Sequence, residues 1–248
     1  MLNKLTVGFI SGLLLILITA TETFPCRPLK TEDCGTTPVN KPSIEWGIEA
    51  ENDNQKINTL SVGYVFNLGL TDKMDAGFEL PFQQSLNSDS SSKNFGDITI
   101  KMKYSLITGA NSQPAFLTKL TVTLPTADKE SGLGTGQSDI GILLVLTKSF
   151  GNFNVYSNIG YTSPARIKNQ DNSNGFLGLG FLQPLNKTIN LLWEFTYEPT
   201  FNSDNHFDTT LGINHGINEN VDWDIAIRKN LNNTGPNYTL ITGLTTSF

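Results

Sequence analysis

Most of the sequence after the first forty residues alternates between apolar and polar positions, and this period of two restricts the chain to β-structure. About twelve segments show the pattern. In residues 43–51, for example, Trp46 and Ile48 share one face, and Glu45 and Glu49 share the other. Because successive side chains of a strand point to opposite faces, each segment has one apolar and one polar face. We therefore expect an all-β protein.

The charged residues indicate where the apolar face points. Within the segments every Asp and Glu lies on the polar face, whereas all three Trp lie on the apolar face. A tilted strand of about nine to eleven residues can cross a bilayer, and these segments have that length. An apolar outer band with aromatic girdles around a polar interior is typical of membrane barrels. The sequence predicts a single antiparallel up-and-down transmembrane β-barrel of about twelve strands over residues 43–248.

The connections alternate in length, as expected for an outer-membrane barrel. Short turns are predicted at residues 70–73, 150–152 and 184–187, and longer polar external loops at 83–95, 126–137, 163–173 and 199–205. Such barrels place short turns in the periplasm and long loops outside, and an even number of strands returns both termini to the periplasm. A secreted soluble β-sandwich is the alternative, with the apolar faces packed in a core between two sheets. The loop lengths favour a barrel in the cell outer membrane of a Gram-negative bacterium.

The first twenty residues have the pattern of a secretory signal peptide. Lys4 precedes an apolar run at residues 13–18, and the small residue Ala20 ends the pattern. The apolar stretch is shorter than the about 20 residues of a transmembrane helix. We expect a mature chain that begins near Thr21. Residues 21–42 show no strand pattern, and they are interpreted either as a plug-like segment in the lumen or as a loose periplasmic extension.

The two cysteines are close in sequence. In an oxidising compartment, Cys26 and Cys34 are predicted to form a local disulfide. Lipidation of Cys26 is the alternative, but Phe24 and Pro25 are not the small residues that a lipobox requires. Because the whole chain has two Cys and two His, we expect neither a metal site nor a cofactor.

Sixteen charged residues face the lumen in this register. The acidic ones are Glu45, Glu49, Glu51, Asp75, Glu79, Asp97, Asp139, Glu194, Glu198, Asp208, Asp222 and Asp224, and the basic ones are Lys101, Lys103, Lys119 and Arg228. Rings of acid raise the local cation concentration, so one interpretation is a lumen that favours cations or polar solutes. The other is an ion-paired packing that makes the barrel rigid. Eight-stranded barrels are filled by side chains and sixteen-stranded ones leave a channel, so about twelve strands leave both interpretations open.

Three other functions are disfavoured. The formal charge of −6 provides no basic footprint for nucleic acid. The glycine-rich residues 132–136 precede no helix that could hold a phosphate, and they are interpreted as an external loop. A lipid-modifying barrel enzyme would need a nucleophile beside His206 or His215, and the register places no inward Ser one strand away from either. We therefore expect no enzyme and name no catalytic residue.

Several motifs resemble one family of outer-membrane transporters, which is described as MetA-pathway of phenol degradation proteins. The resemblance covers most of the mature chain in order, and it rests on residues 27–36 (RPLKTEDCGT), 44–49 (IEWGIE), 96–98 (GDI), 124–126 (LPT), 132–136 (GLGTG), 139–141 (DIG), 158–162 (NIGYT) and 236–248. The chain departs from the family pattern at Cys26, Cys34 and Ala127. The resemblance implies a barrel that transports small solutes of hydrophobic or aromatic character.

These observations lead to one expected function and one alternative. We expect a channel for passive uptake or export of small molecules, surrounded by outer-membrane lipid. The alternative is a structural or surface-binding barrel with a closed lumen. The strand that ends in Phe248 is expected to pair with the first strand, with Phe248 at the periplasmic interface. The resemblance further implies that the barrel-assembly machinery reads this terminal motif.

Overall fold

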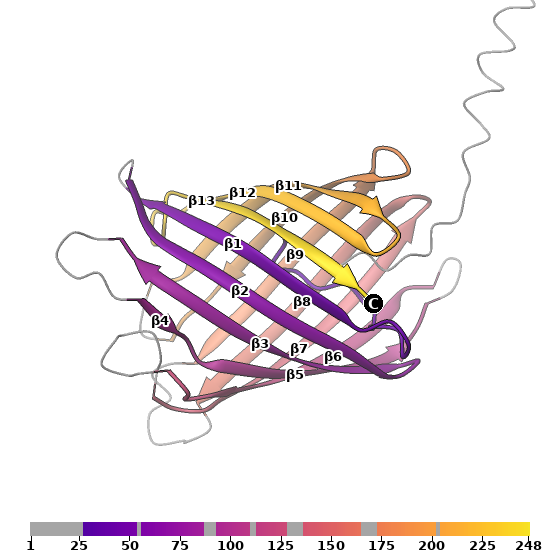
Figure 1. Cartoon of the computed structure of the whole chain (residues 1–248), viewed down its shortest axis with the longest axis horizontal. Coiled ribbons are helices and arrows are strands. Elements are labelled where there is room, and N and C mark those ends of the chain that lie inside the picture. Colours follow the sequence, from indigo (N-terminus) through magenta and orange to yellow (C-terminus); the bar gives the residue numbers. More distant parts are fainter. Residues whose placement is uncertain are drawn as a thin grey trace, which may run out of the picture.

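The computed structural model describes residues 27–53, 56–86, 93–109, 113–127, 136–164, 173–201 and 204–248, which form one antiparallel barrel (Figure 1). Its strands are β1 (Ser43–Asp53), β2 (Lys56–Thr71), β3 (Met74–Ser85), β4 (Lys93–Phe95), β5 (Ile98–Ile107), β6 (Ala115–Leu124), β7 (Asp139–Phe150), β8 (Phe153–Pro164), β9 (Asn174–Pro184), β10 (Ile189–Glu198), β11 (His206–Asn218), β12 (Val221–Asn230) and β13 (Tyr238–Ser247). Twelve of them form the ring, and the short β4 pairs with β3 only. Among these residues there is no helix long and apolar enough to cross a membrane.

The first and last strands close the barrel. β1 pairs with β13 from Ser43 opposite Ser247 to Asn52 opposite Tyr238, and its other edge pairs with β2. Beyond the last strand, the backbone N–H of Phe248 donates to the carbonyl of Pro42 at 2.9 Å. A closed ring leaves no open strand edge, which a barrel in lipid requires. The predicted up-and-down barrel of about twelve strands is confirmed.

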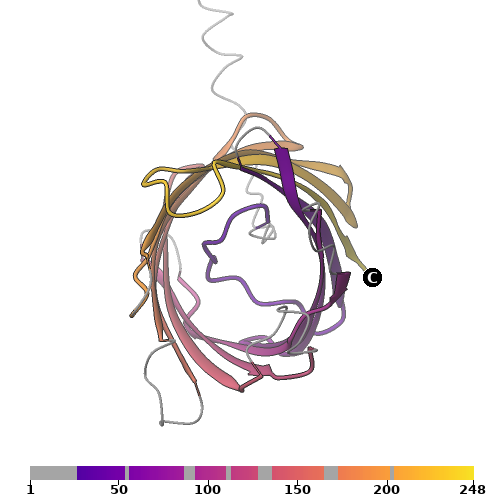
Figure 2. The same ribbon diagram turned by 90° about the vertical axis from the view of Figure 1, so that its left-hand side faces the viewer.

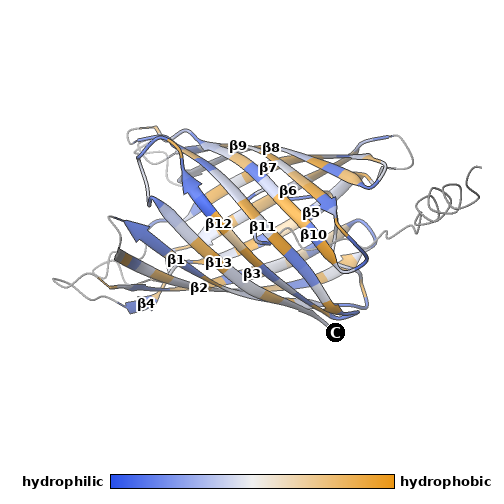
Figure 3. Ribbon diagram, turned by 90° about the horizontal axis from the view of Figure 1, so that it is seen from above, coloured by the Kyte–Doolittle hydropathy of each residue, from blue (hydrophilic) through white to orange (hydrophobic). Residues whose placement is uncertain are grey.

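Most apolar residues of the barrel lie outside, and most polar residues lie inside. Glu194 and Thr210 are fully buried and Asp224 is 1% exposed, whereas Leu211 and Ile225, the next residues along their strands, are 51% and 46% exposed. Apolar and polar residues alternate in this way along the strands in Figure 3. A soluble sandwich would bury its apolar face, so this exposure excludes the sandwich and indicates a barrel wall that faces lipid.

The two ends of the barrel differ. Four short connections, at residues 72–73, 151–152, 185–188 and 219–220, lie at the turn end, whereas β6–β7, β8–β9, β10–β11 and β12–β13 are joined by longer connections at the loop end. One loop prediction is wrong in part. Residues 83–95 are not a single loop, because β3 continues to Ser85 and Phe95 lies in β4, opposite Phe82. The pairing of β3 with β5 stops at Glu79, so β4 covers an edge of β3 that would otherwise be unpaired.

Candidate functional site

Residues 27–42, here called the inner segment, lie within the ring of strands before the chain enters β1 at the turn end (Figure 2). The carboxylate of Glu194 anchors the middle of this segment. It accepts the backbone N–H of Lys30 at 3.0 Å and that of Thr31 at 2.9 Å, and the hydroxyl of Thr210 donates to it at 2.9 Å. A segment without regular structure must find partners for its backbone groups, and Glu194 supplies two of them.

Side chains of other strands bind the next residues of the inner segment. Asn158 of β8 accepts the N–H of Glu32 at 2.7 Å. Thr147 of β7 accepts the N–H of Cys34 at 3.0 Å. Asp75 of β3 accepts the N–H of Thr37 at 2.7 Å. The wall of the barrel therefore holds the backbone of the segment from several sides.

Two cations of the inner segment pair with acidic residues of the wall. Nε of Arg27 lies 3.2 Å from Asp224. Nζ of Lys30 lies 2.6 Å from Glu198 and 2.9 Å from Asp208. Burial lowers the pKa of Lys30 and so does Arg228, but the two carboxylates outweigh both effects and raise the pKa above its ordinary value. Lys30 therefore remains charged in the lumen.

Glu32 of the inner segment binds a pair of lysines. Lys103 of β5 and Lys119 of β6 are direct cross-strand partners, an arrangement that is destabilising for like charges. The carboxylate of Glu32 forms ion pairs with both, with Nζ of Lys103 at 2.6 Å. Burial raises the pKa of Glu32, but the lysines outweigh burial and hold it well below the ordinary value. Glu32 thus neutralises a repulsion that the wall would otherwise contain.

The inner segment also makes apolar contacts. Leu29 packs against a small buried cluster on the inner wall, formed by Tyr156, Leu182 and Leu192. Contacts of this kind exclude water from the hydrogen bonds around them and strengthen those bonds.

Cys34 has a free thiol in the described part of the chain. Its sulfur lies 3.3 Å from the carbonyl of Val145, and burial raises the pKa of the thiol to about 11. Such a thiol is unreactive at neutral pH. Its predicted partner, Cys26, lies outside the described residues, so the disulfide stays a prediction.

Glycines of the wall make room for the inner segment. Gly47 and Gly243 lie opposite each other, and a Cβ on either would overlap the guanidinium of Arg27. At Gly69 a Cβ would run into the backbone of Thr37 and Pro38. These strand positions are therefore occupied by the one residue that permits so close an approach.

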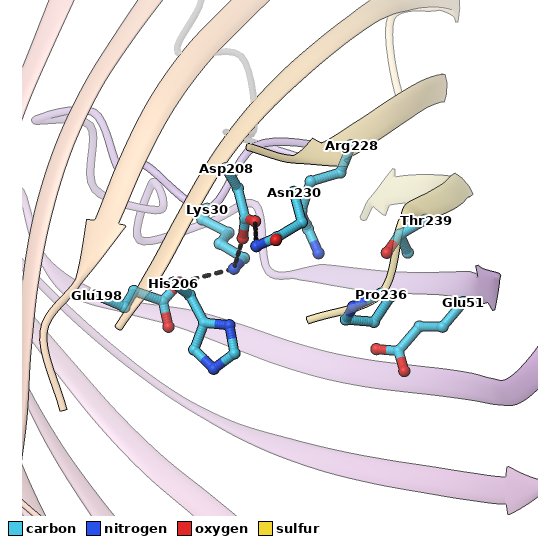
Figure 4. A pocket seen from close by; sticks show the side chains of 9 residues that line it. All are labelled: Lys30, Glu51, Glu198, His206, Asp208, Arg228, Asn230, Pro236 and Thr239. Atoms are coloured by element: carbon cyan, nitrogen blue, oxygen red, sulfur yellow. Dashed lines mark hydrogen bonds and ion pairs between the residues drawn. The ribbon is translucent and has the colours of Figure 1, made fainter. Parts of the chain in front are cut away.

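The inner segment separates two cavities. The loop-end cavity has a volume of about 200 Å³, and Figure 4 shows Lys30 pointing at Glu198 and Asp208 within it, with His206 and Arg228 nearby. The turn-end cavity has a volume of about 560 Å³. Lys30 lines both cavities, so its side chain lies at the boundary between them.

All sixteen residues proposed above to line the lumen are buried or half-buried, and none is exposed on the outer face. Those that bind the inner segment are Asp75, Lys103, Lys119, Glu194, Glu198, Asp208 and Asp224. Those that bind other parts of the chain are Glu45, Glu49, Asp97 and Arg228. Glu79, Lys101 and Asp222 line the turn-end cavity, Glu51 lines the loop-end cavity, and Asp139 begins β7 at the loop end.

Sequence reasoning left open whether residues 21–42 enter the lumen, and it did not single out the side chains of this segment that bind the wall. Arg27, Lys30 and Glu32 lie in a segment without periodicity, so no pattern assigned them an inward position. The available signal was indirect. Glycines such as Gly47 and Gly69 recur on the polar face of the strands, where a side chain would be expected unless another element fills the space.

Comparisons with known proteins agree with this architecture. The model of the family described as "Putative MetA-pathway of phenol degradation" matches residues 49–248. No curated protein matches the chain. Among solved structures, an outer membrane channel from Pseudomonas putida F1 is similar with a TM-score of 0.67 and 12% sequence identity, over 89% of this chain and 100% of the other.

Two porins are also similar in structure. The KdgM porin, solved in complex with disordered oligogalacturonate, matches with a TM-score of 0.61 and 10% identity over 83% of this chain and 99% of its own. The NanC porin matches with a TM-score of 0.61 and 10% identity over 84% of this chain and 100% of its own. At such identities the likeness establishes the fold. The outward apolar band then places the barrel in the cell outer membrane.

Proposed function

Because the chain belongs to the family described as "Putative MetA-pathway of phenol degradation" and its barrel encloses two polar cavities, we propose that it is a passive outer-membrane channel for small solutes. The observation that carries this proposal is the position of Lys30. The two cavities share this flexible side chain as a lining residue, so the barrier between them is part of the inner segment. If the side chains of the strands filled the lumen, there would be no two cavities for the inner segment to divide.

The similar structures support a channel. One is described as an outer membrane channel and two as porins. The hydrophobic or aromatic character of the solute rests on the family description alone. The polar lining of both cavities favours solutes that carry at least one polar group.

We propose that solutes pass between the cavities when the inner segment shifts or when the side chain of Lys30 rotates away from Glu198 and Asp208. Both ion pairs face the loop-end cavity, where water and ions compete for them. Passage of the solute between the cavities requires no chemical reaction. In a passive channel, binding along the path must be weak enough for the solute to leave.

We also propose that the barrel catalyses no reaction. His206 lines the loop-end cavity, where a substrate could reach it. Its Nδ1 lies 3.5 Å from the hydroxyl of Thr234, which is longer than the contact between a base and the nucleophile that it activates. That hydroxyl lies 2.7 Å from the carbonyl of Asn205 and 2.9 Å from Oδ1 of Asn232, and both oxygens accept its proton in preference to the more distant His206. The pair therefore lacks the geometry of an activated nucleophile.

Planar-bilayer recording of the purified full-length protein tests the proposal. A channel gives discrete current steps in symmetrical salt, and their size is small because the inner segment occupies the lumen. The dense hydrogen bonding of that segment favours one other function, a structural barrel with a closed lumen. Complete absence of steps from correctly folded protein would support that alternative and contradict the channel.

A further inference from the structure

Three lysines share one region of the inner wall. Lys101 and Lys103 are two residues apart on β5 and therefore point to the same side, and Lys119 lies opposite Lys103 on β6. All three line the turn-end cavity. Three ammonium groups on adjacent strands repel one another unless an anion lies between them.

Lys101 is the least compensated of the three. The residue is only 9% exposed, and within the described part of the chain its ammonium has neither a hydrogen bond nor an ion pair. Glu32 and Glu45 influence it by charge, without a contact at salt-bridge distance. An ammonium that lines a cavity without a contacting carboxylate attracts an anion, so this position favours an anion from the turn-end cavity.

The neighbouring lysines already bind a carboxylate. Glu32 contacts both Lys103 and Lys119, and it belongs to the inner segment and not to the barrel wall. This carboxylate shows which chemical group the lysines accommodate. Because it is carried on a separate segment, it can leave without any change in the strands.

We propose that Lys101, Lys103 and Lys119 form a binding site for the carboxylate group of a solute, which competes with Glu32 for the lysines. The inference rests on the proposed channel function, because a solute must reach the turn-end cavity. It assigns that channel a substrate class, small carboxylates. It also assigns Glu32 the role of an internal competitor that occupies the site when no solute is present.

Calorimetric titration of the full-length protein in detergent micelles tests the site, with propionate as the probe and propionamide as its uncharged analogue. Glu32→Gln removes the competing charge and retains the side-chain shape. We expect this variant to bind propionate about tenfold more tightly than the wild type, because an ion pair in this setting is worth about that factor. Asp33→Asn is the matched control on the same segment, and we expect its affinity to stay within about twofold of the wild type.

A second variant tests the lysines. In the Glu32→Gln background, Lys101→Gln is expected to lower propionate affinity about tenfold, because it removes the cation that lacks a protein partner. Heat-modifiable gel mobility verifies that each variant is folded. Equal propionate affinity in wild type and Glu32→Gln would overturn the site. Propionamide that binds as tightly as propionate would overturn it as well. Inorganic phosphate that binds as tightly as propionate would overturn its assignment to carboxylates.

Calorimetry separates this inference from the proposed function. Propionate binding without current steps in a bilayer would retain the site and contradict the channel. Current steps without propionate binding in any variant would retain the channel and contradict the site.

Discussion

Glu32 and Asn158 exchange two hydrogen bonds inside the barrel. The backbone N–H of Glu32 donates to Oδ1 of Asn158 at 2.7 Å, and Nδ2 of Asn158 donates to the carbonyl of Glu32 at 2.9 Å. The side-chain amide thus pairs with the backbone of the inner segment as a neighbouring strand would. Because Asn158 is 5% exposed, water competes weakly for either bond.

Asn158→Ala should therefore loosen the inner segment without unfolding the barrel. Losing two buried hydrogen bonds weakens the docking of the segment by about 1–3 kcal/mol. We expect faster tryptic cleavage after Lys30. Asn154→Ala is the control, since Asn154 lies on the same strand and bonds to Ser149 near the turn end. Equal cleavage rates in the two variants would show that Asn158 does not hold the segment.

Acid should release the inner segment only at low pH. The pKa of Glu32 is lowered in the folded protein, so its ion pairs contribute stability above its ordinary pKa of 4.5 and lose that contribution as the pH falls through the lowered value. Channel conductance is expected to be constant from pH 7 to about pH 5 and to rise well below pH 4.5. Glu32→Gln should abolish this rise. A rise in conductance at or above pH 4.5 in the wild type would contradict its assignment to protonation of Glu32.

A methyl group at Gly69 should displace the inner segment. In Gly69→Ala the new Cβ meets the backbone of Thr37 and Pro38, which cannot rotate aside as a side chain can. Overpacking of this kind costs about 1–3 kcal/mol, so conductance should increase. Gly63→Ala on the same strand is the control, because nothing lies within 4 Å of its Cβ. An increase in both variants would mean that the effect comes from the strand and not from the segment.

Much of the fold was predictable because one physical constraint acts at every strand position. Lipid outside and polar groups inside impose a period of two, which placed Trp193 outward and Glu194 inward from sequence alone. The position of the inner segment follows no such repeat. Lys30 and Thr31 bind Glu194, which is 164 and 163 residues away in sequence, through their backbone N–H groups. Because nearly every residue type has such a donor, the sequence does not indicate these contacts. β4 was missed because three residues are too few to show alternation.

Phe248 is expected to matter more for assembly than another equally exposed phenylalanine. Its backbone extends the closing strand, and its ring is 65% exposed at the turn end. Phe248→Ala should reduce the amount of folded barrel in the outer membrane several-fold, on the expectation that the assembly machinery reads this residue. Phe201→Ala is the control at the loop end, where the ring is 62% exposed. Equal membrane yields would contradict the role of the terminal residue, since lost apolar area is matched.

The single-channel conductance of Lys30→Ala shows whether the path through the lumen runs past Lys30. Lys30 lines both cavities, so a shorter side chain widens the boundary between them and the single-channel conductance should rise about two-fold or more. Lys148→Ala is the matched control, because Lys148 lies over the ring of Phe150 near a strand end and lines neither cavity. We expect larger current steps in Lys30→Ala than in the wild type and unchanged steps in Lys148→Ala. Identical steps in all three proteins, or no steps in any of them, would contradict a solute path past Lys30.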